Sequence, residues 1–354
     1  MWARSNPKSV VAVIAVTLAA SSCTSPEPNS NATETPATAT RSPSSEASPS
    51  ATLPISGRGW IAYQAPQGST PDRVFLVHID GSGDHPIAQG LPGSVAHPDF
   101  SRDGSRLVFE QLSRDTSHTQ IYVATADGAK IHRIALCKPP SCLDYYAPSW
   151  SPDGKQLAIS TDGGMLTSDG PTRFGLAIID VASEEVHPIV DHPAIQGQDL
   201  FPRWSPDGKQ LVFWRDRFLG GSVKTAIFIV NADGSGLQQL TPWSMLAGDP
   251  DWSPDGSLIV FTTHPLFEFS EGEESELYTM RPDGSEVRAL TSYGPDGPRA
   301  TQPRWTPDGK AILYTRLSQA ALPREIWVIN GDGTGDVPVL DTKSIYTHPV
   351  LQPS

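Results

Sequence analysis

The sequence predicts an all-β fold, a six-bladed β-propeller of four-stranded blades, and a phrase repeated at blade spacing is the main observation behind this prediction. The phrase reads HPDFSRDGSRLVF (97–109), APSWSPDGKQLAI (147–159), FPRWSPDGKQLVF (201–213), DPDWSPDGSLIVF (249–261) and QPRWTPDGKAILY (302–314). Its turn aspartates are Asp103, Asp153, Asp207, Asp255 and Asp308, which are 50, 54, 48 and 53 residues apart. Such a period is typical of one propeller blade.

The chemistry of the phrase predicts a strand, a tight turn and a second strand. Pro in Ser-Pro-Asp-Gly presets φ near −65°, Asp tolerates the next turn position, and Gly ends the turn. A short segment that ends in an aromatic residue precedes the turn, and an apolar, β-branched segment such as Leu211–Phe213 follows it. The phrase therefore supplies the first two strands of a blade.

Two further strands follow each phrase. The third strands, with their Asp-Gly or similar hairpin turns, are IYVATADG (121–128), LAIIDVAS (176–183), IFIVNADG (227–234), LYTMRPDG (277–284) and IWVINGDG (326–333). The fourth and weaker strands are HRIAL (132–136), EVHPIV (185–190), LQQLT (237–241), VRALT (287–291) and VPVLD (337–341). Hairpin turns at these places are typical of antiparallel sheets.

The two ends of the repeat region complete a sixth blade. Residues 59–63, 75–81 and 85–89 have the character of a second, third and fourth strand, and no first strand precedes them. Residues 348–354 (HPVLQPS) begin like the phrase and stop at its turn. We expect the two segments to share one blade, which closes the ring and removes free sheet edges.

With WSPDGK, IYV…DG and a closing LT, the repeat resembles the TolB-type propeller repeat over residues 55–354. TolB proteins carry an α/β domain before the propeller, and here a different segment occupies that place. The resemblance implies the propeller fold, and it does not imply a role in the Tol system.

The N-terminus reads as an export signal over residues 1–22. Arg4 and Lys8 precede an apolar run, Val10–Ala20, that is too short to span a bilayer. Cys23 follows, and the arrangement resembles the lipobox of bacterial lipoproteins, although the family favours Leu where Ala20 stands. We expect lipidation of Cys23; the alternative is ordinary cleavage and secretion.

The chain has three cysteines. Cys137 and Cys142 flank a short loop that a disulfide could close in an oxidising compartment. That pairing leaves Cys23 over, which a lipid would explain. The alternative is that the two loop thiols stay reduced.

Residues 23–54 are rich in Ser, Thr, Pro and Ala and have no apolar period. Such a composition cannot bury a core, so we expect a disordered tether between the lipidation site and the propeller. The predicted domains are therefore 1–22, 23–54 and 55–354.

Charge and motifs narrow the function classes. The formal net charge is −13, which argues against nucleic acid as a partner. The sequence contains no G-x-S-x-G, P-loop, H-E-x-x-H or clustered C-x-x-C motif. We therefore expect a binding protein rather than an enzyme.

Long loops are expected on one face of the propeller only. They are the segments 161–175, 214–225 and 262–276 and the links 137–147, 190–200 and 241–248. Variation confined to one face suggests recognition there. The acidic segment 264–276 is a candidate partner loop, through Phe267, Glu268, Phe269, Glu271, Glu273 and Glu274; the alternative is a solvated acidic loop.

The central channel is the second candidate site. The residues before the phrase proline are expected to line it, and His97, Asp249, Gln302 and His348, with the adjacent Tyr146, could hold a divalent metal or a small ligand. Metal-dependent lyases on related propellers use His and Gln in this region. The alternative is a wet polar channel with no cofactor.

Two functions follow as hypotheses. The first is an extracytoplasmic, monomeric binding or scaffold protein, lipid-anchored to the bacterial cell membrane or else secreted, that engages a protein or cell-envelope ligand. The second is a metal-dependent hydrolase or lyase that acts on a sugar or lactone in the channel.

Overall fold

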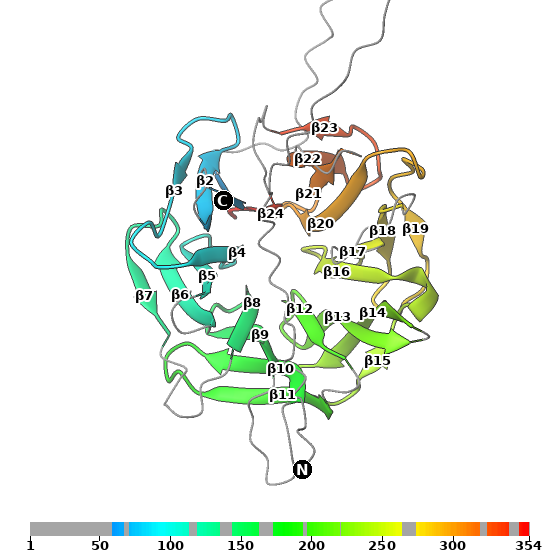
Figure 1. Ribbon diagram of the computed structural model, residues 1–354, viewed down its shortest axis with the longest axis horizontal. Coiled ribbons are helices and arrows are strands. Elements are labelled where there is room, and N and C mark those ends of the chain that lie inside the picture. Colours follow the sequence, from blue (N-terminus) through cyan, green and yellow to red (C-terminus); the bar gives the residue numbers. More distant parts are fainter. Residues whose placement is uncertain are drawn as a thin grey trace, which may run out of the picture. The chain divides into compact units, whose positions relative to one another are not determined.

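The structure is a computed structural model. It describes residues 59–66, 71–112, 119–134, 144–162, 173–193, 197–219, 221–263, 274–318, 324–339 and 347–353. These segments form six antiparallel four-stranded sheets arranged around a central axis (Figure 1).

Each sheet is one blade, and its four strands follow one another in order from the central axis to the outside. Blade 1 comprises β24 (Thr347–Leu351), β1 (Trp60–Pro66), β2 (Asp72–His78) and β3 (His85–Pro86). Blade 2 comprises β4 (Ser94–Phe100), β5 (Arg106–Leu112), β6 (Thr119–Thr125) and β7 (Ile131–Arg133). Blade 3 comprises β8 (Asp144–Trp150), β9 (Gln156–Asp162), β10 (Arg173–Asp180) and β11 (Val186–Pro193).

The other three blades repeat the order. Blade 4 comprises β12 (Asp199–Trp204), β13 (Gln210–Leu219), β14 (Ser222–Asn231) and β15 (Gln238–Gln239). Blade 5 comprises β16 (Ala247–Trp252), β17 (Ile259–Thr263), β18 (Leu277–Met280) and β19 (Arg288–Ala289). Blade 6 comprises β20 (Arg299–Trp305), β21 (Ala311–Leu317), β22 (Arg324–Asn330) and β23 (Val337–Pro338).

The predicted shared blade is confirmed. β24 pairs with β1 through Ile61–Leu351, Ala62–Val350 and Gln64–Thr347. Gln352 extends the closure, because its backbone N–H donates to the Trp60 carbonyl at 2.8 Å and its side chain donates to the Gly104 carbonyl of blade 2 at 2.7 Å. The ring is thus closed by non-covalent contacts between the two ends of the propeller.

The expected loop at 214–225 is wrong. Strands β13 and β14 run through it as a hairpin, with Leu219 opposite Ser222, so only Gly220 and Gly221 remain for the turn. A two-residue Gly-Gly connection suits a tight hairpin because both positions tolerate positive φ, and Gly221 has a φ of 89°. Four of the fourth strands, β3, β15, β19 and β23, have two residues each and are shorter than expected, whereas β11 has eight.

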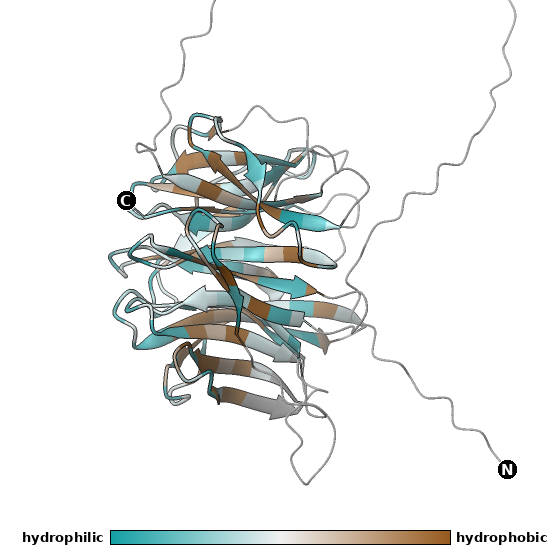
Figure 2. Ribbon diagram, turned by 90° about the vertical axis from the view of Figure 1, so that its left-hand side faces the viewer, coloured by the Kyte–Doolittle hydropathy of each residue, from teal (hydrophilic) through white to brown (hydrophobic). Residues whose placement is uncertain are grey.

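The hydrophobic core consists of six clusters, one between each pair of neighbouring blades. The second strands supply much of it, and all five residues of β17 are buried. Figure 2 shows the hydrophobic residues in the body of the blades and the hydrophilic ones at the turns. Among the described residues, no helix is long and apolar enough to cross a membrane.

The strands divide the propeller into two faces. We call the face with the turns between strands one and two and between strands three and four the short-turn face. We call the opposite face, with the connections between strands two and three and between blades, the long-loop face. Gly59, where the described chain begins, lies beside Gln352 on the short-turn face.

Candidate functional site

Six equivalent residues ring the channel, one from the first strand of each blade. They are His97, Ala147, Phe201, Asp249, Gln302 and His348, and all six have a positive φ of 49° to 56°. Each precedes a proline, and the pairing register of the strand shifts at or next to this point. Proline cannot donate to the ladder, so the strand bulges there. The bulge turns these residues out of the regular ladder in every blade.

Positive φ is unfavourable for residues other than glycine, so surrounding contacts must hold this ring of residues. Backbone N–H groups of the ring donate across the blade boundaries. Ala147 donates to Glu110 Oε2 at 2.5 Å and Phe201 to Ser160 Oγ at 3.1 Å. Because acceptor and donor lie on neighbouring blades, these bonds join the blades as well as fixing the bulge.

Three aromatic side chains of the ring meet at the axis. The ring centroids of His97 and His348 are 4.4 Å apart, and those of His97 and Phe201 are 5.0 Å apart. Phe201 and His348 stack with centroids 5.9 Å apart. These side chains come from blades 2, 4 and 1, so the contacts bring together residues that are distant in sequence.

Gln302 fixes the position of His348 through two hydrogen bonds. Its Oε1 accepts from the backbone N–H of His348 at 3.1 Å and from Thr315 Oγ1 at 3.0 Å. Its Nε2 therefore faces His348 Nε2, at 2.9 Å, as the donor. Burial lowers the pKa of His348 well below its ordinary value, with His97 adding to the effect. His348 is thus neutral, with the lone pair of Nε2 used by Gln302.

Two carboxylates, those of Glu110 and Asp249, interact with His97. His97 Nδ1 lies 2.8 Å from Glu110 Oε1, and Asp249 interacts with His97 electrostatically. Burial raises the pKa of Asp249 to about 6, opposed by a hydrogen bond from the backbone of Gln302. The structure brings His97, Asp249, Gln302 and His348 together, and Tyr146 lies on β8 next to Ala147 and is half-buried.

Among the described residues, no three His, Cys, Asp or Glu side chains converge so that they could hold a metal ion. His348 Nε2, the nitrogen directed at Gln302, already accepts a hydrogen bond. His97 Nδ1 contacts Glu110, whereas His348 Nδ1 is buried without a hydrogen-bond partner among the described residues.

A second ring of charged residues, which the sequence reasoning missed, lies one step further along the first strands. It contains Asp99, Arg203, Asp251 and Arg304, each directly after the phrase proline. Arg304 Nη1 lies 3.6 Å from Asp251 Oδ1 and 3.9 Å from Asp99 Oδ1, and Arg203 Nη1 is also 3.9 Å from Asp99 Oδ1. The alternation of Asp and Arg at this one position of the aligned phrases could have revealed the cluster.

Burial dominates the ionisation of this second ring. It raises the pKa of Asp99 and raises that of Asp251 to about 7, while it lowers the pKa of Arg203. Asp99 and Asp251 also accept backbone N–H groups of Trp150 and Trp305 in the next blades, at 2.9 and 2.8 Å. The cluster thus ties the inner strands together across the channel.

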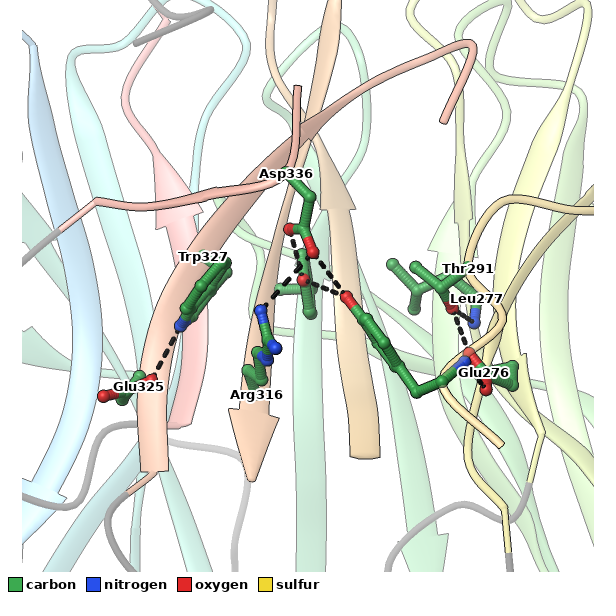
Figure 3. A network of polar contacts seen from close by, with 9 residues as sticks. Glu276, Leu277, Thr291, Arg316, Glu325, Trp327 and Asp336 are labelled. Carbon is green, nitrogen blue, oxygen red and sulfur yellow. Dashed lines mark hydrogen bonds and ion pairs between the residues drawn. The ribbon is translucent and has the colours of Figure 1, made fainter. Parts of the chain in front are cut away.

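A third polar network lies between blades 5 and 6 (Figure 3). Asp336 accepts hydrogen bonds from the hydroxyls of Tyr293 and Tyr314, both at 2.6 Å, and lies 3.4 Å from Arg316 Nη1. The Arg316 guanidinium stacks 3.8 Å from the ring of Trp327. Burial raises the pKa of both tyrosines, so both stay protonated as donors.

Blade 1 has a simpler version of this network, in which Tyr63 donates to Asp84 at 2.6 Å. Tyr63 and Tyr314 occupy the same place in their strands. In blade 6 the added partner is Tyr293, from the link between β19 and β20. The buried carboxylate of Glu276 anchors that link by accepting from Thr291 Oγ1 and the backbone of Tyr293 and Gly294. The network is therefore a structural repeat elaborated to fasten an inter-blade link.

The candidate partner loop 264–276 lies mostly outside the described residues. Of its proposed contact residues only Glu274 is described, and it is exposed; Glu276, at the end of the segment, is buried and holds the link to blade 6. Cys23, Cys137, Cys142, Phe267, Glu268, Phe269, Glu271 and Glu273 fall outside the described residues. Their predicted roles stay predictions. On the described part of the long-loop face, the feature that stands out is the β13–β14 hairpin, with Phe218 74% exposed and Val223 52% exposed.

The fold and the channel define a six-bladed propeller closed by a blade that both ends share. A family model described as the TolB beta propeller domain matches residues 177–353, half of the chain. The chain belongs to this family of propellers.

Similarity to whole proteins is more limited. The chain is 36% identical over 123 residues to dipeptidyl-peptidase 5 of Porphyromonas endodontalis and 32% identical over 118 residues to the uncharacterized peptidase YuxL of Bacillus subtilis. These matches cover 34% and 32% of this chain but 16% of each peptidase. The crystal structure of TolB from Acinetobacter baumannii has a TM-score of 0.61 at 20% identity, covering 85% of this chain and 69% of TolB. At that identity the likeness shows the fold alone.

Proposed function

We propose that the protein is an exported binding or scaffold propeller, held at the outer face of a bacterial membrane by a lipid on Cys23. In this proposal a protein or cell-envelope ligand is engaged by the long-loop face. The acidic segment with Phe267, Glu268, Phe269, Glu271, Glu273 and Glu274 forms part of the contact, and a disulfide between Cys137 and Cys142 closes another loop. The propeller acts as a monomer.

This proposal rests on a contrast within the chain: the turns of the short-turn face have the same geometry in blades 2 to 6, whereas the hairpins of the long-loop face vary in length. Every turn between strands one and two in blades 2 to 6 has the same hydrogen bond, from a Ser or Thr hydroxyl to the turn Asp, at 2.6 to 2.7 Å. The hairpins between strands two and three range from four to ten paired residues. Surface variation on a constant scaffold supports recognition by the variable side.

The packing of the channel supports binding rather than catalysis in the channel. The side chains of His97, Phe201, Gln302 and His348 contact one another, and the charged ring is neutralised internally. A group that acts on a substrate has to be within hydrogen-bond reach of it. Here Gln302 Nε2 and His348 Nε2 are committed to each other and His97 Nδ1 contacts Glu110, while His348 Nδ1 is buried without a hydrogen-bond partner among the described residues.

The test is a capture experiment from bacterial envelope extracts with residues 50–354 as bait, a span that is compact by itself. A variant with Glu271, Glu273 and Glu274 changed to Gln is the comparison, and a variant with Asp207, Asp233 and Asp255 of the short-turn face changed to Asn is the matched control. We expect the first variant alone to lose the captured ligand. Equal loss in both variants, or loss only in the control, would place recognition elsewhere.

Anchoring has a separate test on the full-length chain. Cys23→Ala should move the protein from the membrane fraction to the soluble fraction. A Cys23→Ala protein that stays in the membrane fraction as the unchanged chain does would contradict the lipid anchor.

A further inference from the structure

The β13–β14 hairpin projects from the long-loop face as a two-stranded ribbon. Its ten cross-strand pairs run from Gln210–Asn231 to Leu219–Ser222. The neighbouring strands stop earlier: β12 pairs with β13 up to Asp199–Arg215, and β15 reaches β14 at Phe228 and Ile229. At a rise of about 3.3 Å per residue, residues 217–219 and 222–224 extend the ribbon by roughly 10 Å.

The residues near the end of the ribbon are apolar, and the next cross-strand pair toward the body of the propeller consists of two basic residues. Phe218 and Val223 face each other across the strands and are the two most exposed large hydrophobic side chains among the described residues. The next pair toward the body is Arg217 and Lys224, and within the described residues neither has an ion pair. Like charges directly opposite each other destabilise a hairpin. An anionic surface outside the protein would relieve this repulsion.

Contacts with the body of the propeller hold the base of the ribbon in place. Arg215 forms a two-pronged ion pair with Asp199, with N–O distances of 2.5 and 2.8 Å, and stacks 4.7 Å from the ring of Phe228. The Arg217 guanidinium lies 4.0 Å from the ring of Trp243 in the link to blade 5. A tip held in place loses little conformational freedom when it binds.

We propose that this hairpin docks on an anionic lipid bilayer, with Phe218 and Val223 in the interfacial region and Arg217 and Lys224 at the depth of the phosphates. Apolar residues at the end and cations one step behind match the depth profile of a membrane interface. The aspartates of the short-turn face lie at the other end of the strands, away from such a surface. The contact goes beyond the proposed ligand binding and rests only on the proposed placement at a membrane.

Co-sedimentation of residues 50–354 with vesicles tests the proposal. One set contains phosphatidylcholine only, and the other contains phosphatidylcholine with phosphatidylglycerol. We expect binding to the anionic set, a loss of at least about fivefold for Phe218→Ser with Val223→Ser, and a comparable loss for Arg217→Gln with Lys224→Gln. Added salt should weaken the binding.

The matched control is Leu237→Ser with Val287→Ser. These side chains are each 45% exposed and follow turns of the short-turn face. The control should bind vesicles like the unchanged chain. Because Phe218, Val223, Leu237 and Val287 are all exposed, the two serine variants should keep the unchanged denaturation midpoint, which checks the fold.

Three outcomes would overturn the membrane contact. They are no binding to anionic vesicles, equal binding by the Phe218 and Val223 variant, and equal losses in the variant and the control. If this variant binds vesicles normally but loses a protein captured from envelope extracts, the hairpin is a protein-docking element. In that case the proposed ligand binding stands and the lipid contact fails.

Discussion

The two faces of the propeller are built from the same repeat, but the turns on one face are nearly identical between blades, whereas the connections on the other face differ. On the short-turn face, blades 2 to 6 share a Ser or Thr, an Asp and a Gly in one hydrogen-bonded turn, and the Gly N–H donates to the Ser or Thr carbonyl at 2.8 to 2.9 Å. On the long-loop face, blade 4 projects a ten-pair ribbon, and blade 6 receives a tyrosine from a link.

This difference indicates how the contributions to folding stability are distributed between the two faces. The aspartates of the turns are exposed and their bonds are local, so each should contribute little and all should contribute alike. The long-loop face contains buried charges that depend on one particular partner. We therefore expect substitutions there to have the larger and more individual effects.

The largest expected effect comes from Asp199→Ala. Its carboxylate is fully buried and pairs with Arg215, which is 14% exposed. Removing one partner leaves a buried charge uncompensated, so the free energy of unfolding should fall by about 3 to 5 kcal/mol in urea denaturation. Asp207→Ala, in the same blade on the short-turn face, should cost about 1 kcal/mol or less. Equal costs at the two positions would remove the distinction between the faces.

The next effect concerns pH and the channel between the two faces. Burial raises the pKa of Asp251 to about 7, above the value of about 3.9 expected in the unfolded chain. The folded state then holds the proton that the unfolded state has released. The contribution of Asp251 to stability is therefore fully present below about pH 4 and is lost as the pH rises through 7.

Denaturation measured between about pH 5 and pH 8 should show this decline, at up to about 1.4 kcal/mol per pH unit for this group. Asp251→Asn cannot ionise and should have a flatter profile. Parallel profiles for Asp251→Asn and the unchanged chain would mean that another group governs the pH response.

A smaller effect is expected from Tyr293→Phe, which removes the hydroxyl that donates to Asp336 and contacts Tyr314 at 2.7 Å. The loss should be about 1 to 2 kcal/mol of unfolding free energy, because a charged acceptor loses one of its donors. Tyr122→Phe is the control, since the hydroxyl of that tyrosine has only a 3.4 Å contact with Gln120. A loss for Tyr122→Phe as large as that for Tyr293→Phe would show that the link is not specially fastened.

The smallest effect is expected from Lys209→Ser on the short-turn face. The Lys209–Asp207 ion pair, at 3.3 Å, joins side chains that are 79% and 56% exposed. The equivalent position of blade 5 already holds a serine, Ser257, whose hydroxyl donates to Asp255 at 2.8 Å. The change in unfolding free energy should stay below about 0.5 kcal/mol in the same assay. A larger change would mean that the turns are less interchangeable than their geometry suggests.

The repeat made the blades predictable, because a turn such as Ser-Pro-Asp-Gly has a local mechanism that reads directly from the sequence. The shared blade followed from the same logic, since HPVL at 348–351 could pair only with a blade that lacked a first strand. The positive φ of His97 and its five equivalents was not foreseen. It arises from a bulge in the tertiary ladder, and residues before proline ordinarily favour extended backbone.

Two parts of the candidate site escaped prediction for different reasons. The residues Asp99, Arg203, Asp251 and Arg304 share one position of the aligned phrases, but they are far apart in the chain and meet only when the ring closes. The segment 214–225 looked like a loop, because its polar residues and Gly-Gly resemble a linker. The continuous pairing of Phe218 with Val223 shows that they belong to a ribbon.

The Gln352 closure has a mechanical consequence. Tension applied from the N-terminal side would reach the propeller at Gly59 and Trp60. Trp60 exchanges two hydrogen bonds with Gln352, whose side chain is also tied to Gly104 of the next blade. A pull would thus be shared at once by blade 1, which contains the seam, and by blade 2. The junction that completes the ring is also the point best placed to bear load.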